Sequence, residues 1–351
     1  MSVRTTRRRF AVAAGLSAAL LLTACTGNTA EEADDGDGDT TSNAGASSSN
    51  DDTGETVTIG FSAPAADHGW MAAITSLAVD EAEKYDDIDL RLADGTNDVA
   101  LQISQMETFI NDGVDAIVML PFDGASLTPI ALEAMAAGIP VINVDREFSD
   151  PNAARVTVLG DNYGMGVSAG EYMCERLEGE SDPVIAEIAG IDNLPLTQDR
   201  SQGFEDALSE CGLSVAHRVA AEFTAQSGET VTSSLLQALP EIDAIWNHDD
   251  DQGLGVMAAI ENAGRDEFFM VGGAGSANAM RDIEAGDSVL EATVIYPASQ
   301  AADGIRLARL LAQQKGMSDL VQVEVPRLVQ LYAPVVTSEN VDQYIDTAFE
   351  S

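Results

Sequence analysis

An acid and a base follow one another at the end of a short apolar stretch in the middle of the chain. The stretch is Val141–Val144, entered through Gly138–Pro140, and the pair is Asp145 and Arg146. A β-branched run of this length is typical of a buried parallel strand, whose carboxyl end faces the crevice where ligands bind in open α/β sheets. A carboxylate accepts hydrogen bonds and a guanidinium donates them, which together suit a neutral polyhydroxylated molecule. A structural ion pair is the alternative.

Polar and aromatic side chains also follow the first expected strand, in the segment Ala66–Met71. Trp70 offers a flat apolar face that stacks on the C–H face of a sugar ring, while His68 or Asp67 offers hydrogen bonds. We therefore expect Trp70 and His68 to line a ligand site. The alternative is that Trp70 is a core residue in the first turn of a helix.

Three consecutive acids lie in the segment Asn247–Gly253, before another expected helix. Acids at this position cap a helix and satisfy its free N–H groups, which accounts for one of the three. Asp249 or Asp250 is then available as an acceptor for ligand hydroxyls. A calcium loop is disfavoured because the alternating spacing of its ligands is absent.

Two further loops are expected at the same strand ends. Val271–Ser276 is rich in glycine but has no GKS/T ending and no nearby lysine, so a Walker-type phosphate loop is excluded. Its glycines instead permit close backbone approach to a ligand or to a neighbouring loop. Asp161–Gly164 follows the expected strand Val156–Gly160, where we expect the chain to cross between domains.

The elements that position these loops alternate between strand and helix from Val57 onward, which predicts parallel sheets with right-handed crossovers. Roughly ten strands are too many for one ordinary sheet, so we expect two. Gly113–Asp123 and Glu241–Asp251 have similar patterns, which supports two similar halves with an interdomain cleft. Helices are predicted to begin near Trp70, Val99, Ser126, Gly164, Leu196, Gly228, Gly253, Asn278 and Ser299, and strands at Val57–Phe61, Asp89–Ala93, Ala116–Leu120, Val141–Val144, Val156–Gly160, Val184–Ile188, Ala244–Trp246, Phe269–Val271 and Ala292–Ile295.

Composition limits the classes of partner. The chain has 351 residues, of which 59 are acidic and 17 basic, giving a formal charge of -42. Phosphate repulsion at this charge excludes direct binding to nucleic acid. The hydrophobic content of 45% and the length fit a soluble protein of two domains. Such acidity is compatible with a saline habitat but does not establish one.

The beginning of the chain has the features of an export signal. Basic residues at Arg4 and Arg7–Arg9 precede the apolar stretch Phe10–Leu22, and Leu22–Cys25 resembles a bacterial lipobox. We predict a signal peptide over 1–24, a lipidated Cys25 and a disordered acidic tether over 25–55. The protein would then be exported and anchored to the outer face of the cytoplasmic membrane by lipid alone, through either the general or the twin-arginine route.

Two cysteines remain, Cys174 and Cys211, and an oxidising compartment favours a disulfide between them. Two buried free thiols are the alternative. The three histidines form no zinc-ligand spacing with these thiols, and we expect no metal, no cofactor and no catalytic residue.

Together, these motifs resemble those of the ribose-type (type I) periplasmic binding proteins, which are substrate-binding subunits of bacterial sugar ABC importers. The resemblance runs from about Val57 to the end of the chain. It implies a clamshell of two Rossmann-like α/β domains joined by a three-strand hinge near Gly160, Ile295 and Pro326. The domains would be 56–160 plus 296–326, and 161–295 plus 327–351. The matching segments are Phe61–Met71, Val141–Arg146, Gly160–Asn162, Arg200–Phe204, Asp249–Gly255, Val271–Gly272 and Thr337–Val341.

The resemblance also implies a set of ligand contacts. The sequence differs from the pattern of a ribose binder at Leu120, Gln198, Gly273-Ala274 and Ile295. We therefore expect the ligand to be a sugar or polyol other than D-ribose. Tyr296 and Gln300 stand near the last of these positions. The implied ligand-binding residues are His68, Trp70, Met71, Asp145, Arg146, Gln198, Arg200, Phe223, Asp249, Asp250, Gly273, Tyr296 and Gln300.

The resemblance implies a monomeric binding protein that captures a sugar-like molecule and delivers it to the permease subunits of an ABC transporter. A receptor of the same fold that feeds a membrane sensor remains the alternative. A glycoside hydrolase using Asp145 and Asp249 is disfavoured, because Arg146 should keep Asp145 ionised. The export signal and the missing helix-turn-helix exclude a transcription factor.

Overall fold

The computed structural model describes residues 50–317 and 324–351. The predicted signal peptide, Cys25 and most of the predicted tether lie outside these residues. The last residues of that tether, 50–55, are held by hydrogen bonds: Gly54 N donates to Asp87 at 2.5 Å, and Arg309 donates to the carbonyl of Asp52 at 2.9 Å. Within the described ranges, no helix has the length and apolar character needed to cross a membrane.

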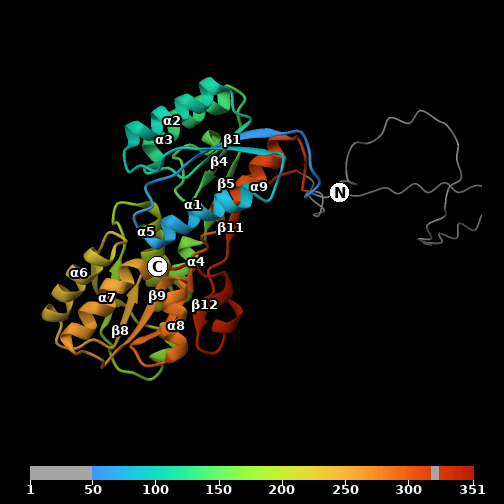
Figure 1. Cartoon of the computed structure of the whole chain (residues 1–351). Coiled ribbons are helices and arrows are strands. Elements are labelled where there is room, and N and C mark those ends of the chain that lie inside the picture. Colours follow the sequence, from blue (N-terminus) through green and yellow to red (C-terminus); the bar gives the residue numbers. More distant parts are fainter. Residues whose placement is uncertain (1–49, 318–323) are drawn as a thin grey trace, which may run out of the picture. The chain divides into compact units, whose positions relative to one another are not determined.

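The described strands form two six-stranded sheets, both belonging to the compact unit Gly45–Ser351 (Figure 1). Every pairing is parallel except that of β12 with β10. The first sheet has the order β11-β5-β4-β3-β1-β2 and the second β12-β10-β9-β8-β6-β7. The strands are β1 Val57–Ser62, β2 Ile88–Leu92, β3 Ala116–Met119, β4 Val141–Val144, β5 Val156–Gly160, β6 Ile185–Ala189, β7 Val215–Ala220, β8 Ala244–Asn247, β9 Phe269–Ala274, β10 Leu290–Ile295, β11 Leu328–Leu331 and β12 Val335–Thr337.

Helices cover both faces of each sheet, so the central strands are apolar on both sides. In β3, Ile117 and Met119 pack under α2 and α3, whereas Ala116 and Val118 face α1 and α9. We call the first sheet with α1, α2, α3 and α9 the first lobe, and the second sheet with α4–α8 the second lobe. The helices are α1 Gly69–Ala82, α2 Val99–Asp112, α3 Gly124–Ala136, α4 Asn162–Arg176, α5 Pro195–Glu210, α6 Ala225–Ala238, α7 Asp250–Ala263, α8 Ala277–Ala285 and α9 Gln300–Ala312.

The predicted fold class of two parallel α/β sheets is confirmed. Each predicted helix is present and begins within three residues of its predicted start. The strands β7, β11 and β12 were not predicted. β7 and β11 lie at the ends of their sheets with exposed or half-buried residues, and β12 has only three residues, so none carries a buried apolar run.

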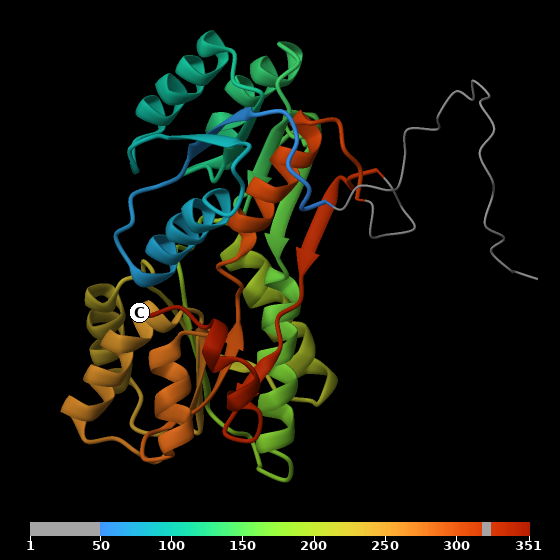
Figure 2. The ribbon, with the colours of Figure 1, turned by 45° about the vertical axis from the view of Figure 1, so that its right-hand side comes forward.

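In the part of the chain that the structure describes, three crossings join the lobes. The first two crossings follow β5 and β10, as expected near Gly160 and Ile295. The third differs from the expected position near Pro326, because β11 forms parallel hydrogen bonds with β5 in the first sheet. It therefore lies between Leu331 and Val335. Figure 2 shows β11 in red beside β5 in green, both running toward the second lobe.

The predicted disulfide is present. Cys174 at the end of α4 and Cys211 just after α5 are bonded, with their Cα atoms 6.0 Å apart. The bond links two adjacent helices of the second lobe.

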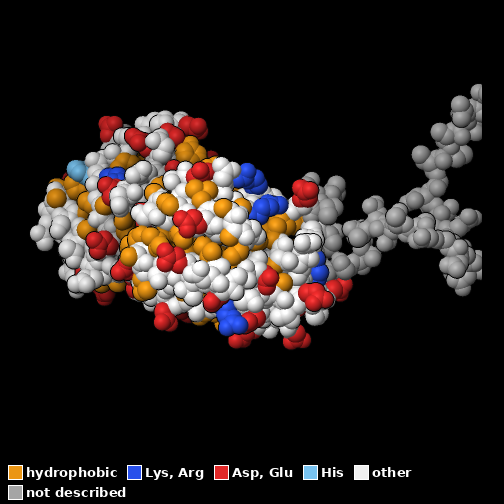
Figure 3. All heavy atoms as spheres, turned by 90° about the horizontal axis from the view of Figure 1, so that it is seen from above, with side chains coloured by type: hydrophobic (Ala, Val, Ile, Leu, Met, Phe, Trp, Pro, Cys, Tyr) orange, Lys and Arg blue, Asp and Glu red, His pale blue; other side chains and the backbone are white. Residues whose placement is uncertain are grey.

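Figure 3 shows acidic side chains spread over one face of the molecule with few basic ones, in keeping with the charge.

Candidate ligand-binding site

A small cavity lies between the two lobes at the carboxyl ends of their strands. Its volume is about 30 Å³. Nine of the thirteen expected ligand-binding residues line it, together with Leu196, which sequence analysis did not assign to the site. The lining residues are His68, Trp70, Met71, Asp145, Arg146, Leu196, Arg200, Phe223, Asp249 and Tyr296.

Asp145 lies directly after β4 and is nearly inaccessible to solvent, with 4% of its surface exposed. Its backbone φ is 64°, in the left-handed region that residues other than glycine rarely adopt. A backbone hydrogen bond from its N–H to the carbonyl of Val158 (3.0 Å) holds this conformation. Its Oδ1 accepts from the hydroxyl of Tyr296 at 2.5 Å. Strained backbone of this kind is concentrated at functional sites, where it aims a side chain.

Arg146 presents an unused donor beside this carboxylate. Its terminal nitrogen donates to the carbonyl of Phe122 at 2.8 Å, which fixes the guanidinium in place. Its Nε lies 3.7 Å from Oδ2 of Asp145, is buried, and has no hydrogen-bond partner among the described residues. The two side chains therefore form an ion pair, as in the alternative interpretation, but without a direct hydrogen bond between them, so that the ligand role stays a prediction. A ligand hydroxyl can accept from Arg146 Nε and donate to Asp145 Oδ2 at once.

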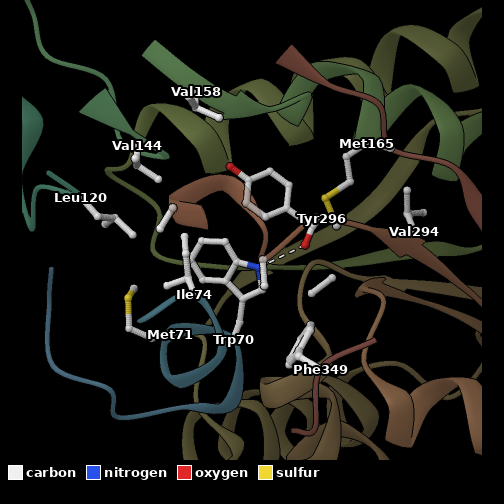
Figure 4. Packing of buried hydrophobic residues seen from close by; sticks show 14 of the residues in the cluster. Trp70, Met71, Ile74, Leu120, Val144, Val158, Met165, Val294, Tyr296 and Phe349 are labelled. Atoms are coloured by element: carbon white, nitrogen blue, oxygen red, sulfur yellow. Dashed lines mark hydrogen bonds between the residues drawn. The ribbon is translucent and has the colours of Figure 1, made fainter. Parts of the chain in front are cut away.

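The first turn of α1 supplies the apolar wall. Trp70 is only 5% exposed and belongs to the core, as the alternative for this residue proposed, yet its ring also lines the cavity. Its Nε1 donates to the carbonyl of Tyr296 at 3.1 Å, and the two rings lie with centroids 5.5 Å apart (Figure 4). His68 contacts Asp67 through Nδ1 at 2.6 Å, which orients its ring. Trp70 is thus a core residue that also borders the cavity, and its contact with a ligand stays a prediction.

The second lobe supplies a cation and an aromatic ring. Arg200 donates from Nε to Asn162 Oδ1 at 2.9 Å, and its guanidinium lies 4.5 Å from the centre of the Tyr296 ring. Phe223 has a φ of 59° and fits against Gly190, where a Cβ would lie 1.9 Å from the ring. A second strained residue is therefore directed into the same cavity.

The three consecutive acids have three different partners. Asp249 caps α7 by accepting from Gln252 N at 3.0 Å, and also lines the cavity. Burial, followed by the negative charge of Asp251, raises the pKa of Asp249 to about 7. Asp250 does not line the cavity: it accepts from the backbone of Gly273 (2.9 Å) and Ser276 (2.7 Å), and so braces the glycine-rich loop.

Asp251 reaches across to the first lobe, which sequence analysis missed. Its carboxylate accepts from the backbone N–H of Gly69 at 3.0 Å and of Trp70 at 2.8 Å. His68, the residue at the N-cap position of α1, makes no side-chain capping bond. The first helix of one lobe is therefore capped by an acid of the other, an interlobe contact that we call the Asp251 clasp. The contact joins residues of different lobes, so no pattern in the neighbouring sequence could predict it.

The remaining expected site residues lie outside the cavity lining. Gln198 is exposed and donates to the carbonyl of Asp192 at 3.3 Å. Gln300 is fully buried, donates to the carbonyl of Pro297 at 3.1 Å, and its Oε1 has no partner among the described residues. Gly273 packs so closely on the carbonyl of His248 that a Cβ there would lie 2.4 Å from the oxygen.

A wider groove lies on the other side of Asp145 and Arg146. It has a volume of about 600 Å³ and also shares Leu196 with the small cavity. Glu147 and Asp199 line it from opposite lobes. The groove therefore has a carboxyl group on each side. Partial desolvation raises the pKa of both groups, and the charge of Asp199 raises that of Glu147 further. No cluster of His, Cys, Asp and Glu suited to a metal occurs in the described ranges.

Comparison with known proteins agrees with this geometry. A model of the periplasmic binding protein domain matches residues 59–316. The ribose import binding protein of Bacillus subtilis (strain 168) is 30% identical over 264 residues, covering 73% of this chain and 84% of that protein. A solved ABC transporter solute binding protein from Bacillus halodurans C-125 with bound myo-inositol has a TM-score of 0.73 and 27% identity, over 84% of this chain and 99% of that one.

A third relative has a different role. The fructose binding periplasmic domain of a hybrid two component system has a TM-score of 0.72 and 26% identity, covering 82% of this chain and 93% of that one. All three relatives are solute-binding proteins and none is an enzyme, which confirms the expected class of protein. With the family model matched over most of its length, the chain belongs to the periplasmic binding protein domain family.

Proposed function

We propose that this chain is the substrate-binding component of a bacterial ABC importer, and that it captures a sugar or polyol between its two lobes. The observation that carries the proposal is the pair at the cavity, in which Arg146 Nε has no hydrogen-bond partner among the described residues and lies 3.7 Å from Asp145 Oδ2. A hydroxyl group is the simplest ligand group that satisfies both. The relatives that bind ribose and myo-inositol support this class of ligand.

The mechanism requires no covalent step. A ligand that contacts Asp145 and Arg146 in the first lobe and Arg200 and Phe223 in the second binds the closed form more tightly than the open form. Its differential affinity therefore drives closure about the three crossings. A permease then recognises the closed lobes. A monomer is sufficient for this cycle of opening and closing. The two domains are then divided at the three crossings.

Export and lipid anchoring belong to the same proposal. The lipobox-like segment ending in Cys25 supports acylation at that residue, and the acidic stretch after it supports a tether to the outer face of the cytoplasmic membrane. Growth with labelled palmitate, followed by purification of the wild type and Cys25→Ser, tests this. Label in both proteins or in neither would contradict it.

The ligand class is tested by a thermal-shift screen of pentoses, hexoses, deoxysugars and polyols. A ligand at 100 times its dissociation constant stabilises the protein by about 2.7 kcal/mol. We expect at least one compound to raise the melting temperature, and Asp145→Ala or Arg146→Ala to abolish the response while leaving the far-ultraviolet circular dichroism spectrum unchanged. A panel without any response would overturn the assignment.

Sensing is the second candidate, because one structural relative is the ligand-binding domain of a two-component system. The two roles are separated by the partner of the closed form. Crosslinking of ligand-saturated protein in its native membrane should yield a permease subunit for import, or a sensor kinase for signalling.

A further inference from the structure

Tyr296 is one of the residues that line the small cavity. It is the first residue after β10, at the second crossing between the lobes, and is only 3% exposed. Its ring lies between the ring of Trp70, with centroids 5.5 Å apart, and the guanidinium of Arg200, 4.5 Å from the ring centre. Figure 4 shows the Tyr296 ring between Trp70 and the strands that carry Val144 and Val158. The Tyr296 ring therefore takes up part of the space next to Trp70 in which a sugar ring would stack.

Packing and hydrogen bonds hold the ring in place. Gly160, at the first crossing, provides the place for it: a Cβ there would lie 2.0 Å from Cε2 of Tyr296. The carbonyl of Tyr296 is tied to Trp70 Nε1. The hydroxyl is tied at both ends, donating to Asp145 Oδ1 and accepting from Asn162 Nδ2 at 3.2 Å. Burial raises the pKa of the phenol, so it remains a donor.

The hydroxyl of Tyr296 therefore already makes one of the contacts that Asp145 offers. Oδ2 of that carboxylate, 3.7 Å from Arg146 Nε, is then the oxygen of Asp145 left for a ligand hydroxyl. The space left is small as well. The cavity volume of about 30 Å³ is far below the roughly 300–1,000 Å³ of sites for drug-sized ligands, so any ligand enters only when the lobes separate. A chain without a ring then has less bulk than a pyranose to place beside Tyr296.

We propose that Tyr296 is a specificity-determining residue that takes the place of one ligand hydroxyl and its carbon, so that the ligand is a short acyclic polyol of about three or four carbons. Slight separation of the lobes admits such a molecule against Trp70 and Phe223, while its hydroxyls meet Asp145 Oδ2 and Arg146 Nε. This inference rests on the proposed function of binding a sugar or polyol, and it narrows that class by size.

Isothermal titration calorimetry with glycerol, erythritol, xylitol, D-ribose and D-galactose tests the inference. We expect the wild type to bind glycerol or erythritol at least about tenfold more tightly than either sugar. Tyr296→Ala, which removes the ring, should reverse this order in favour of xylitol or the sugars. Tyr296→Phe keeps the ring and should keep the order. Tyr172→Phe, in α4 and outside the cavity lining, is the matched control and should behave as wild type.

Two results would overturn the inference and leave the proposed function intact. One is a wild type that binds D-ribose or D-galactose as tightly as the short polyols. The other is a Tyr296→Ala protein that is folded by circular dichroism, binds ligands, and keeps the order of the wild type. If no sugar or polyol binds to the wild type or to any variant, the proposed function itself fails, and the inference with it.

Discussion

Asp251 should control how readily the lobes close. Its carboxylate is buried, 4% exposed, and accepts two backbone hydrogen bonds from the first turn of α1 in the opposite lobe. Opening the lobes breaks both bonds and leaves two N–H groups of α1 without this cap. Loss of a helix cap costs about 0.5–2 kcal/mol, and a hydrogen bond to a charged group contributes about 1.5–3 kcal/mol. About 2 kcal/mol is therefore a reasonable value for the Asp251 clasp.

Asp251→Ala should remove this stabilisation from the closed form alone. If the protein is mostly open without ligand, the observed affinity is proportional to the fraction of molecules that are closed. A loss of about 2 kcal/mol lowers this fraction, and with it the affinity, by about 30-fold. The loss should be seen as faster ligand release. The melting temperature of the ligand-free protein should change little, because the bonds of the clasp join the lobes and do not lie within either one. Asp251→Asn, which keeps one acceptor oxygen, should lose less.

Calorimetry and small-angle X-ray scattering check this prediction. In the variant, more ligand should be needed to reach the compact radius of gyration that the wild type shows when saturated. Asp112→Ala removes an exposed acid of the first lobe and serves as the control for charge. If Asp251→Ala kept wild-type affinity and closed at the same ligand concentration, the clasp would not contribute to closure and the reasoning would be refuted.

Two further predictions concern stability and pH. Replacing both Cys174 and Cys211 by Ser removes a disulfide between residues 37 apart in sequence. The free energy of unfolding, measured by urea titration, should fall by roughly 4 kcal/mol. An unchanged urea midpoint would argue against the disulfide. Ligand affinity should be retained, because the bond lies within one lobe. Partial desolvation in the groove raises the pKa of Glu147 and Asp199, and the charge of Asp199 from the opposite lobe raises that of Glu147 further, so the form with the lobes together binds protons more tightly than the open form. Affinity should therefore rise as pH falls from neutral toward these raised values and level off below the ordinary ones. The double variant Glu147→Gln, Asp199→Asn should lose this dependence, and a slope that persisted in it would assign the effect elsewhere.

The sequence predicted the elements of the fold because their signals are local. Buried strands such as Val141–Val144 are uninterrupted apolar runs, and turn or capping residues mark the helix starts. The same locality explains the failures. β11 pairs through its backbone with β5, and its own side chains are half-exposed, so nothing in Leu328–Leu331 indicates the sheet to which it belongs.

A place in the cavity wall was predictable where it depends on a residue's own strand end, as for Asp145 and Arg146. It was not predictable where the role depends on the opposite lobe. Asp251 resembles an ordinary cap in sequence, yet its partners are 181 and 182 residues away. Gln198 and Asp250 lie beside lining residues in the chain, but the direction of each helical side chain takes them away from the cavity.

The fit of the Tyr296 ring against Gly160 joins two positions that are far apart in sequence and belong to different crossings. Neither can change freely alone, because any side chain at Gly160 collides with the ring, while loss of the ring leaves a void beside the glycine. In the evolutionary record of this family the two positions should covary, with small residues at one accompanying large residues at the other. A change of ligand size along a lineage would then require paired substitutions, with the glycine fixed before the tyrosine.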